Sequence, residues 1–309
     1  MNAFLKLIRF KNLLMIVALQ LIIKYCSLDM QHIPTALNDI QYLLLVLSTV
    51  CIAAGGYIIN NIIDQDTDFL NKPADVIAGK AISESMAYNF YAGFNILGVG
   101  IGFYLSNIIG KPGFAMIFIA ISATLYLYAT SYKKTFLIGN ILVAAITSMC
   151  IIIVGIYEFY PILTEENHIQ LGGVFEIFLD YALFSFILNL IREITKDAED
   201  IKGDTAYGMN TLPIVLGIGK TKKILLGLGI LTILGLLYYI NTYYINNELY
   251  YVAGFMLLFV VGPLLYFVIN ILSVADKTAF KKLSTVLKLV ILSGIISILV
   301  LALNIQANA

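Results

Sequence analysis

The sequence predicts an all-α membrane protein, a bundle of about nine transmembrane helices. Of its 309 residues 60% are hydrophobic and 12% are charged, whereas a soluble domain carries about 25% charged residues. The apolar residues form long uninterrupted runs separated by short polar gaps, which is typical of helices that cross a bilayer. The 19 basic residues balance the 19 acidic ones, so we expect no nucleic-acid partner.

Nine apolar runs have approximately the 20 residues that are needed to span the hydrocarbon core. They cover residues 12–28, 42–63, 87–109, 114–130, 136–158, 175–193, 222–242, 250–272 and 286–305. Because the gaps between them are short, we expect residues 1–309 to form a single helical domain. The first run could belong to a signal peptide, but no small-residue cleavage site follows it, and we interpret it as the first span.

The lysines and arginines orient the predicted bundle. With the N-terminus in the cytoplasm, all of them except Lys24 and Lys111 fall in cytoplasmic segments, as the positive-inside rule requires. We therefore expect a multi-pass integral protein of the inner (cytoplasmic) membrane. Lys24 lies within the first span, where we expect its amine to snorkel outward rather than to line a cavity. Lys277, Lys281 and Lys282 are expected to set the topology and to contact anionic lipid headgroups.

Two long polar segments on the expected cytoplasmic side carry acidic clusters at the ends of spans. In the first, a continuous helix would place Asn60, Asp64 and Asp68 on one face. The second has acids at steps of four, three and four: Glu193, Asp197, Asp200 and Asp204. Stacked carboxylates repel one another unless a cation neutralises them, and Mg²⁺ is usually held by one or two carboxylates together with substrate phosphates. A solvated helix end could explain either cluster alone, but two clusters at the same depth favour a shared magnesium site.

These clusters resemble the two signatures of the UbiA superfamily of intramembrane prenyltransferases. The matching residues are Asn60-x3-Asp64-x3-Asp68 with Asn71-Lys72-Pro73, and the run from Arg192 to Asp204 with Asn210-Thr211-Leu212-Pro213. Nine spans with both motifs in the cytoplasm are also the layout of that superfamily, so the resemblance covers nearly the whole chain. Asn61 and Lys72 depart mildly from it, because many members carry aspartate and arginine there.

The resemblance implies a cytoplasmic active site that holds Mg²⁺ against the diphosphate of an allylic prenyl donor. It assigns Asp64, Asp68, Asp200 and Asp204 as the catalytic and metal-binding residues. The residues expected to contact substrate are Asn60, Lys72, Tyr128, Tyr132, Lys133, Lys134, Arg192 and Asp197. Divalent ions and lysines stabilise the charge that develops on a departing diphosphate, and aromatic faces stabilise an allylic cation. For the Tyr128 to Lys134 segment, ordinary topology-setting lysines beside interfacial tyrosines stay open as an alternative, but we expect Lys133 or Lys134 to contact phosphate.

The run from Arg192 to Asp204 looks most like the branch of this superfamily that transfers a geranylgeranyl group to geranylgeranylglyceryl phosphate. The expected partners are therefore a prenyl diphosphate donor, a hydrophobic or lipid-like acceptor and membrane lipids. An aromatic acceptor of the 4-hydroxybenzoate or naphthoate type stays open as an alternative. Two other classes are less consistent with the sequence. A cation-coupled transporter would place its acids near the midplane, and a CDP-alcohol phosphotransferase would need a DG-x2-AR run.

Overall fold

The computed structural model describes residues 3–73 and 76–308 and is almost entirely helical. The α-helices are α1 (Ala3–Leu7), α2 (Phe10–Leu21), α3 (Asp39–Ile63), α4 (Gln65–Asn71), α5 (Glu84–Ile108), α6 (Ala115–Thr130), α7 (Ile138–Glu158), α8 (His168–Ala206), α9 (Leu212–Leu216), α10 (Ile218–Tyr239), α11 (Tyr250–Met256), α12 (Gly262–Asn270) and α13 (Lys277–Asn308). The π-helical segments are η1 (Ile22–Leu28), η6 (Ile240–Tyr244) and η8 (Leu257–Val261). The short 3-10 turns are η2 (Asp29–Gln31), η3 (Pro112–Phe114), η4 (Tyr132–Lys134), η5 (Tyr160–Ile162) and η7 (Ile245–Asn247). No strand forms among the described residues, which confirms the predicted all-α class.

Within the described ranges, eight helical segments are long and apolar enough to cross a membrane. They are Phe10–Gln31, Asp39–Ile63, Pro112–Thr130, Ile138–Ile162, His168–Ala206, Ile218–Asn247, Tyr250–Asn270 and Lys277–Asn308. The remaining predicted run, 87–109, forms α5, a helix of 25 residues that packs along α3. Its asparagines at 89, 95 and 107 interrupt its apolar run. The prediction of about nine spans therefore agrees with eight clear spans and one further long helix, α5, whose apolar run contains these asparagines.

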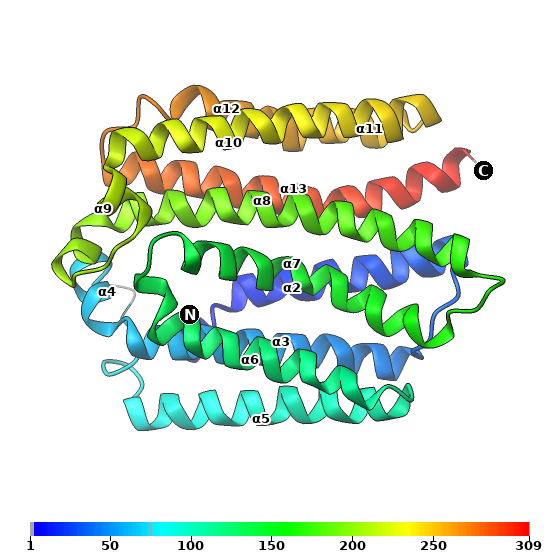
Figure 1. Ribbon diagram of the computed structural model, residues 1–309, viewed down its shortest axis with the longest axis horizontal. Coiled ribbons are helices and arrows are strands. Elements are labelled where there is room, and N and C mark those ends of the chain that lie inside the picture. The colour runs from blue at the N-terminus through cyan, green and yellow to red at the C-terminus, as the bar shows by residue number, and fades with distance from the viewer. Residues whose placement is uncertain (1–2, 74–75, 309) are drawn as a thin grey trace.

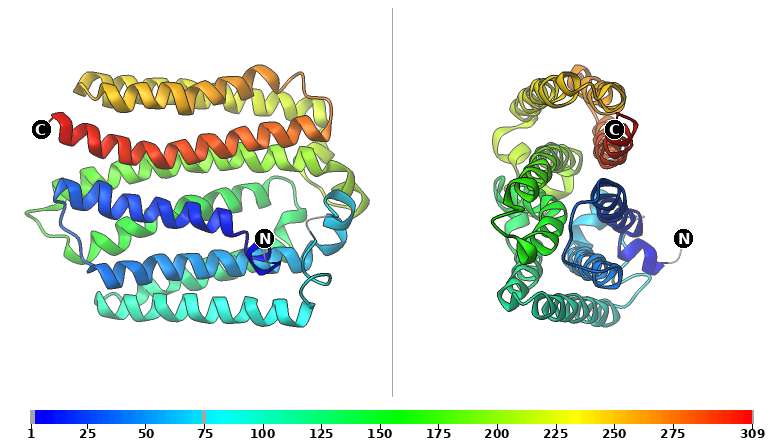
Figure 2. Two further views of the ribbon diagram at one scale, coloured as in Figure 1. Left: turned by 180° about the vertical axis from the view of Figure 1, so that it is seen from behind. Right: turned by 90° about the vertical axis from the view of Figure 1, so that its right-hand side faces the viewer.

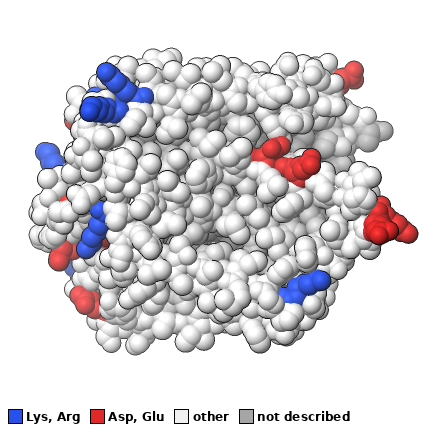
Figure 3. Space-filling view, in the orientation of Figure 1, with Lys and Arg blue, Asp and Glu red and all other residues white. Residues whose placement is uncertain are grey.

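The long helices lie side by side along the long axis of the molecule (Figure 1), and the end-on view shows them arranged in a curved ring (Figure 2). The helices α4 and α9 and the turn η4 lie together at the end that is on the left in Figure 1, here called the site end. In the same orientation most charged side chains lie toward the two ends, one acidic patch lies right of the centre, and the rest of the middle of the face is uncharged (Figure 3). This distribution is typical of a bundle whose central belt faces lipid.

The helix α8 is longer than a bilayer requires. Its 39 residues extend about 58 Å, whereas the hydrocarbon core is about 30 Å thick. The apolar part ends near Ile191, and the remaining turns from Arg192 to Ala206 carry most of the charge. The second acidic motif thus lies on a polar extension of a spanning helix at the site end.

Small residues allow the spanning helices to approach closely. A Cβ atom at Gly98 of α5 would lie 2.7 Å from Ile52 Cγ1 of α3, and one at Gly155 of α7 would lie 2.4 Å from Phe175 Cδ2 of α8. Ser48 Oγ also donates a hydrogen bond to the Gly98 carbonyl at 2.7 Å. Small residues and interhelical hydrogen bonds of this kind stabilise helix pairs in membranes, where no hydrophobic force drives association.

The prediction that Lys24 snorkels outward is wrong. Its side chain is 3% exposed, and its Nζ lies 3.1 Å from Glu158 Oε1 at the end of α7, a side chain that is fully buried. Nζ also donates to Thr35 Oγ1 at 2.8 Å, and Glu158 Oε2 accepts from the Leu37 backbone N–H at 3.0 Å. Because these partners come from the loop after η2 and from α7, they are visible in the fold and not in the local sequence of the first span.

Candidate active site

The end of α4 and the last turns of α8 meet at the site end. Lys72, directly after α4, places its Nζ 2.6 Å from Asp200 Oδ2 and 3.5 Å from Glu199 Oε1. Asn71 Nδ2 donates to Asp204 Oδ1 at 3.5 Å, and Asn71 Oδ1 accepts from the Gly203 backbone N–H at 3.0 Å. The two acidic motifs, far apart in the sequence, therefore lie against each other.

Gly203 makes this contact possible. A Cβ atom at position 203 would lie 2.4 Å from Asn71 Nδ2 and 2.5 Å from Asn71 Cγ. Those separations are far shorter than van der Waals contact, so a side chain at Gly203 would displace the Asn71 amide and break its hydrogen bonds to Gly203 and Asp204. The glycine in the second motif is thus explained by the close approach of the first.

Asp64 lies where α3 gives way to α4. Its φ of −88° and ψ of 1° interrupt the helix, yet the Asp64 N–H donates to the Asn60 carbonyl at 2.9 Å and the Asp68 N–H to the Asp64 carbonyl at 2.8 Å. The predicted spacing of Asn60, Asp64 and Asp68 therefore persists across the break. The buried Asp64 carboxylate forms an ion pair with Lys133 of η4.

The η4 turn closes one side of the site. The Lys134 carbonyl accepts a hydrogen bond from the Asn210 N–H at 2.8 Å, which ties the turn to the segment after α8. The side chains of Tyr132 and Lys134 are exposed, whereas Tyr128, one turn earlier on α6, is partly buried and within electrostatic reach of Asp64. Of this predicted group, Lys133 contacts an acid and Tyr128 lies within electrostatic reach of one, whereas Tyr132 and Lys134 are exposed.

The first turns of the polar part of α8 make a separate set of contacts. Asn140 Nδ2 of α7 donates to Asp197 Oδ2 at 2.7 Å. Arg192 Nη1 lies 3.2 Å from Glu193 Oε1, and Lys196 Nζ lies 2.8 Å from Glu193 Oε2. Arg192, which the resemblance assigns to the substrate, thus contacts an acid that is one turn away from Asp197.

The charged groups at the junction of α4 and α8 shift one another's pKa values. Burial, and then the neighbouring Asp64 carboxylate, raise the pKa of Asp68 above its ordinary value. Burial alone would lower the pKa of Lys72, but the charge and hydrogen bond of Asp200 outweigh it, and the pKa of Lys72 is raised. The site therefore holds Lys72 firmly cationic and makes a second negative charge beside Asp64 costly unless a cation compensates it.

Sequence reasoning missed three residues of the site: Glu199, which contacts Lys72, and Asn140 and Lys277, which contact the predicted acids. Glu199 stands inside the second motif, and Asn140 follows the basic turn, so position in the sequence was a weak signal for both. Lys277 was expected to contact lipid headgroups, but its Nζ donates to the Asn71 carbonyl at 2.7 Å and lies 3.5 Å from Asp200 Oδ1. That prediction missed the contacts of Lys277, because its partners lie at the end of α4 and on α8.

The residues at this junction have the donor chemistry of a divalent metal site. In residues 3–73 and 76–308 no three His, Cys, Asp or Glu side chains already converge as a metal cluster. The ammonium groups of Lys133 and Lys72 lie against Asp64 and Asp200 instead. The buried Asn60 Oδ1 has no hydrogen-bond donor, which leaves an oxygen ligand available. Hard carboxylate and amide oxygens of this kind suit Mg²⁺.

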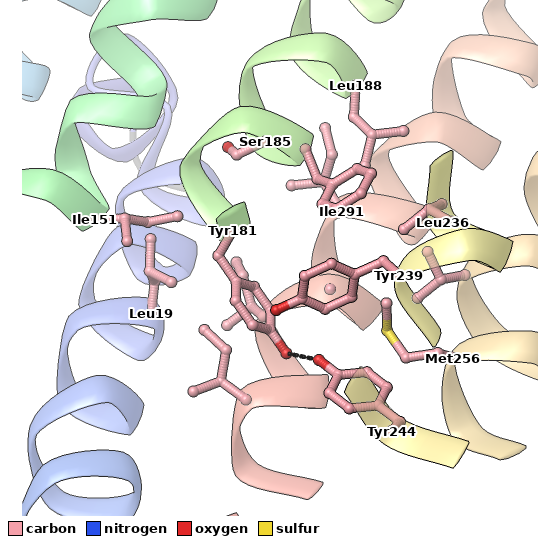
Figure 4. Close-up of a pocket in the computed structure, with 15 residues that line it drawn as sticks. Leu19, Ile151, Tyr181, Ser185, Leu188, Leu236, Tyr239, Tyr244, Met256 and Ile291 are labelled. Carbon is pink, nitrogen blue, oxygen red and sulfur yellow. Dashed lines mark hydrogen bonds between the residues drawn. The ribbon is translucent and has the colours of Figure 1, made fainter. Parts of the chain in front are cut away.

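An apolar pocket lies deeper in the bundle, between α8, α10 and α13 (Figure 4). Leu188, one turn before Arg192 on α8, is among its lining residues. Tyr181, Tyr239 and Tyr244 also line it, and the Tyr181 and Tyr244 hydroxyl oxygens lie 3.1 Å apart. The pocket therefore places a mainly hydrocarbon surface close to the charged turns of α8.

The sequence matches the model of the UbiA prenyltransferase family over residues 32–292. The chain belongs to this family. It is 32% identical over 267 residues to the digeranylgeranylglyceryl phosphate synthase of Methanobrevibacter smithii, a match that covers 86% of this chain and 87% of that protein. It is 33% identical over 262 residues to the digeranylgeranylglyceryl phosphate synthase of Saccharolobus solfataricus, covering 83% of each chain. The resemblance on which the sequence analysis relied is thus confirmed.

The UbiA fold is confirmed by a solved structure. A UbiA homologue from Archaeoglobus fulgidus bound to GPP and Mg²⁺ aligns with a TM-score of 0.55 and 16% sequence identity, covering 96% of this chain and 99% of that one. This member of the UbiA family is therefore a multi-pass integral membrane protein and a prenyltransferase.

Proposed function

We propose that this protein transfers a geranylgeranyl group from its diphosphate to geranylgeranylglyceryl phosphate, with Mg²⁺ as the cofactor. The observation that carries the proposal is the contact of Lys72 and Asn71 with Asp200 and Asp204, which joins the two acidic motifs in one site. The acceptor is supported by the relatives named digeranylgeranylglyceryl phosphate synthase. The whole chain would act as one UbiA domain.

The proposed metal ligands are the carboxylates Asp64, Asp68, Asp200 and Asp204, with the unpartnered Asn60 Oδ1 beside them. Mg²⁺ bound there would neutralise the diphosphate and make it a better leaving group. With Mg²⁺ on these acids, Lys133 and Lys72 would be free of their present ion pairs with Asp64 and Asp200 and could contact the phosphate oxygens. Their charge is then available where the leaving group gains electrons.

The reaction itself exchanges one carbon–oxygen bond for another. The bond between the allylic carbon and the diphosphate breaks with its electron pair on the diphosphate oxygen. The acceptor hydroxyl oxygen then bonds to that carbon and releases its proton to the departed diphosphate. Tyr128 lies close enough to the acids for its ring to face the cationic carbon, which an aromatic face stabilises without trapping it. The pocket beside Leu188 would hold the isoprenoid chain.

The site is proposed to face the cytoplasm. All lysines and arginines other than Lys24 and Lys111 fall on that side if the N-terminus is inside, which agrees with the positive-inside rule. Lys133, Lys72 and Lys277, which meet at the site end, are among them. Cysteine labelling of Lys134→Cys in sealed vesicles tests this side directly, because the Lys134 side chain is exposed.

An acceptor competition tests the function. The purified enzyme is given radiolabelled geranylgeranyl diphosphate and Mg²⁺ with either geranylgeranylglyceryl phosphate or 4-hydroxybenzoate. We expect labelled diether lipid and no prenylated aromatic product, because the closest contacts of the site are ionic rather than aromatic. Product on the aromatic ring alone would refute the proposed acceptor and support the quinone-type alternative.

A further inference from the structure

A second group of positive charges lies where α2, α8 and α13 meet, apart from the contacts of Lys72 and Lys133. This cation cluster consists of Arg9, Arg192, Lys196 and Lys288. Lys288 Nζ donates to Asn12 Oδ1 at 2.6 Å, which joins α13 to the start of α2. Lys288 is within electrostatic reach of the other three cations. Residues distant in the sequence therefore bring four positive charges to one place.

The cation cluster has too few acids to balance it. Arg192 and Lys196 share the one carboxylate of Glu193, and among the ion pairs of the described residues none includes Arg9 or Lys288. The Arg192 Nε is buried and makes no hydrogen bond. A buried donor without a partner is energetically unfavourable, so the missing partner points to an anion at this cluster.

The geometry also leaves the cluster accessible and close to the proposed reaction. The Arg192 and Lys196 side chains are 21% and 27% exposed, so a ligand can reach them. Arg192 precedes Asp200 by eight positions on α8, which is about 12 Å along the helix. Arg9 adopts a left-handed backbone with φ 48° and ψ 51°, a strained conformation for a residue other than glycine that turns the chain between α1 and α2.

We propose that the cation cluster binds a phosphate monoester, namely the phosphate of the acceptor, and so separates it from the donor diphosphate at the acidic motifs. This inference rests on the proposed function. Arginine and lysine donors in a partly buried site form strong charge-assisted hydrogen bonds to a phosphate. With its phosphate on Arg192 and Lys288, the acceptor would extend its hydroxyl along α8 toward Asp197 and Asp200. The cluster thus selects a phosphorylated acceptor over a neutral alcohol.

Lys288→Gln tests the cluster, because glutamine can keep the contact with Asn12. Lys281→Gln is the matched control, since Lys281 lies two turns earlier on the same helix and its side chain is exposed. Binding of geranylgeranylglyceryl phosphate and of geranylgeranylglycerol is measured without donor by isothermal titration, and turnover is measured with each. We expect Lys288→Gln to weaken binding of the phosphate by about tenfold, the loss of one charged contact. Lys288→Arg should restore it, and binding of geranylgeranylglycerol should not change.

The outcomes separate this inference from the proposed function. If the wild type makes diether lipid and Lys288→Gln binds both acceptors as the wild type does, the cluster proposal is overturned and the function stands. Equal weakening for both acceptors also overturns it, because that result indicates a structural role. If binding depends on Lys288 and on the phosphate but no diether lipid forms, the anion site stands and the proposed function fails.

Discussion

The two ends of the bundle both bury charge, but they do so in different ways. At the end away from the site, Lys24 and Glu158 are 3% and 0% exposed and face each other. Lys24 Nζ also donates to Thr35 Oγ1, and the Leu37 N–H donates to Glu158 Oε2. At the site end, Lys72 and Asp200 are 25% and 18% exposed and belong to a wider group of acids and lysines. The pair of Lys24 and Glu158, here called the closed pair, is enclosed by protein, whereas the group around Lys72 and Asp200 can be reached by a ligand.

The difference shows which buried charges indicate function. A fully enclosed ion pair whose groups have their partners holds two segments together and has no capacity left. Glu158 Oε1 makes no hydrogen bond but has Lys24 Nζ at 3.1 Å as its ionic partner. At the site end, Asn60 Oδ1 and Arg192 Nε are buried with neither a hydrogen bond nor an ionic partner, and the charges of Asp64 and Asp68 repel each other. Unsatisfied polar atoms beside partly exposed charges are therefore a better marker of a ligand site than an ion pair as such.

The largest expected effect is the loss of activity on neutralising an acid at the site end. Asp200→Asn removes a proposed metal ligand and the strongest partner of Lys72. We expect kcat/KM to fall by about 10³-fold, roughly 4 kcal/mol in the barrier. The measurement is initial-rate turnover of radiolabelled geranylgeranyl diphosphate. The free energy of unfolding should change little, because Glu199 remains close to Lys72; activity near that of the wild type would contradict the metal assignment.

Breaking the closed pair should lower stability and leave activity nearly unchanged, the opposite of the effect of Asp200→Asn. Lys24→Met leaves the Glu158 carboxylate buried without a countercharge, which typically costs about 3 kcal/mol. We expect a lower free energy of unfolding in denaturant titrations, with near-normal kcat per folded molecule. The double variant Lys24→Met with Glu158→Gln should recover part of the stability, since the introduced glutamine carries no charge and can still accept from the Leu37 N–H. A large fall in kcat at unchanged stability would show that the two ends are not functionally distinct.

The sequence predicted the bundle and the meeting of the two acidic motifs, but not which charges are paired. Hydropathy and spacing depend on neighbours along the chain, and they were sufficient for eight spans and for the stripe from Glu193 to Asp204. The partners of Lys24 and Lys277 come from distant segments, Glu158 and Asn71, so both lysines were misread as ordinary membrane-interface residues. The clearance at Gly203 is likewise visible only once α4 is in place.

The smallest expected effect is a stability change on binding Mg²⁺, and it distinguishes the two ends without any substrate. A ligand that binds only the folded state at 100 times its Kd stabilises it by about 2.7 kcal/mol. We expect added Mg²⁺ to raise the thermal unfolding temperature of the wild type and a chelator to reverse the shift and stop turnover. The Lys24→Met variant should keep the Mg²⁺ shift on a lower baseline, because its acids at the site end are intact. The Asp200→Asn variant should lose most of the shift; equal shifts in Asp200→Asn and wild type would place the metal away from the acidic motifs.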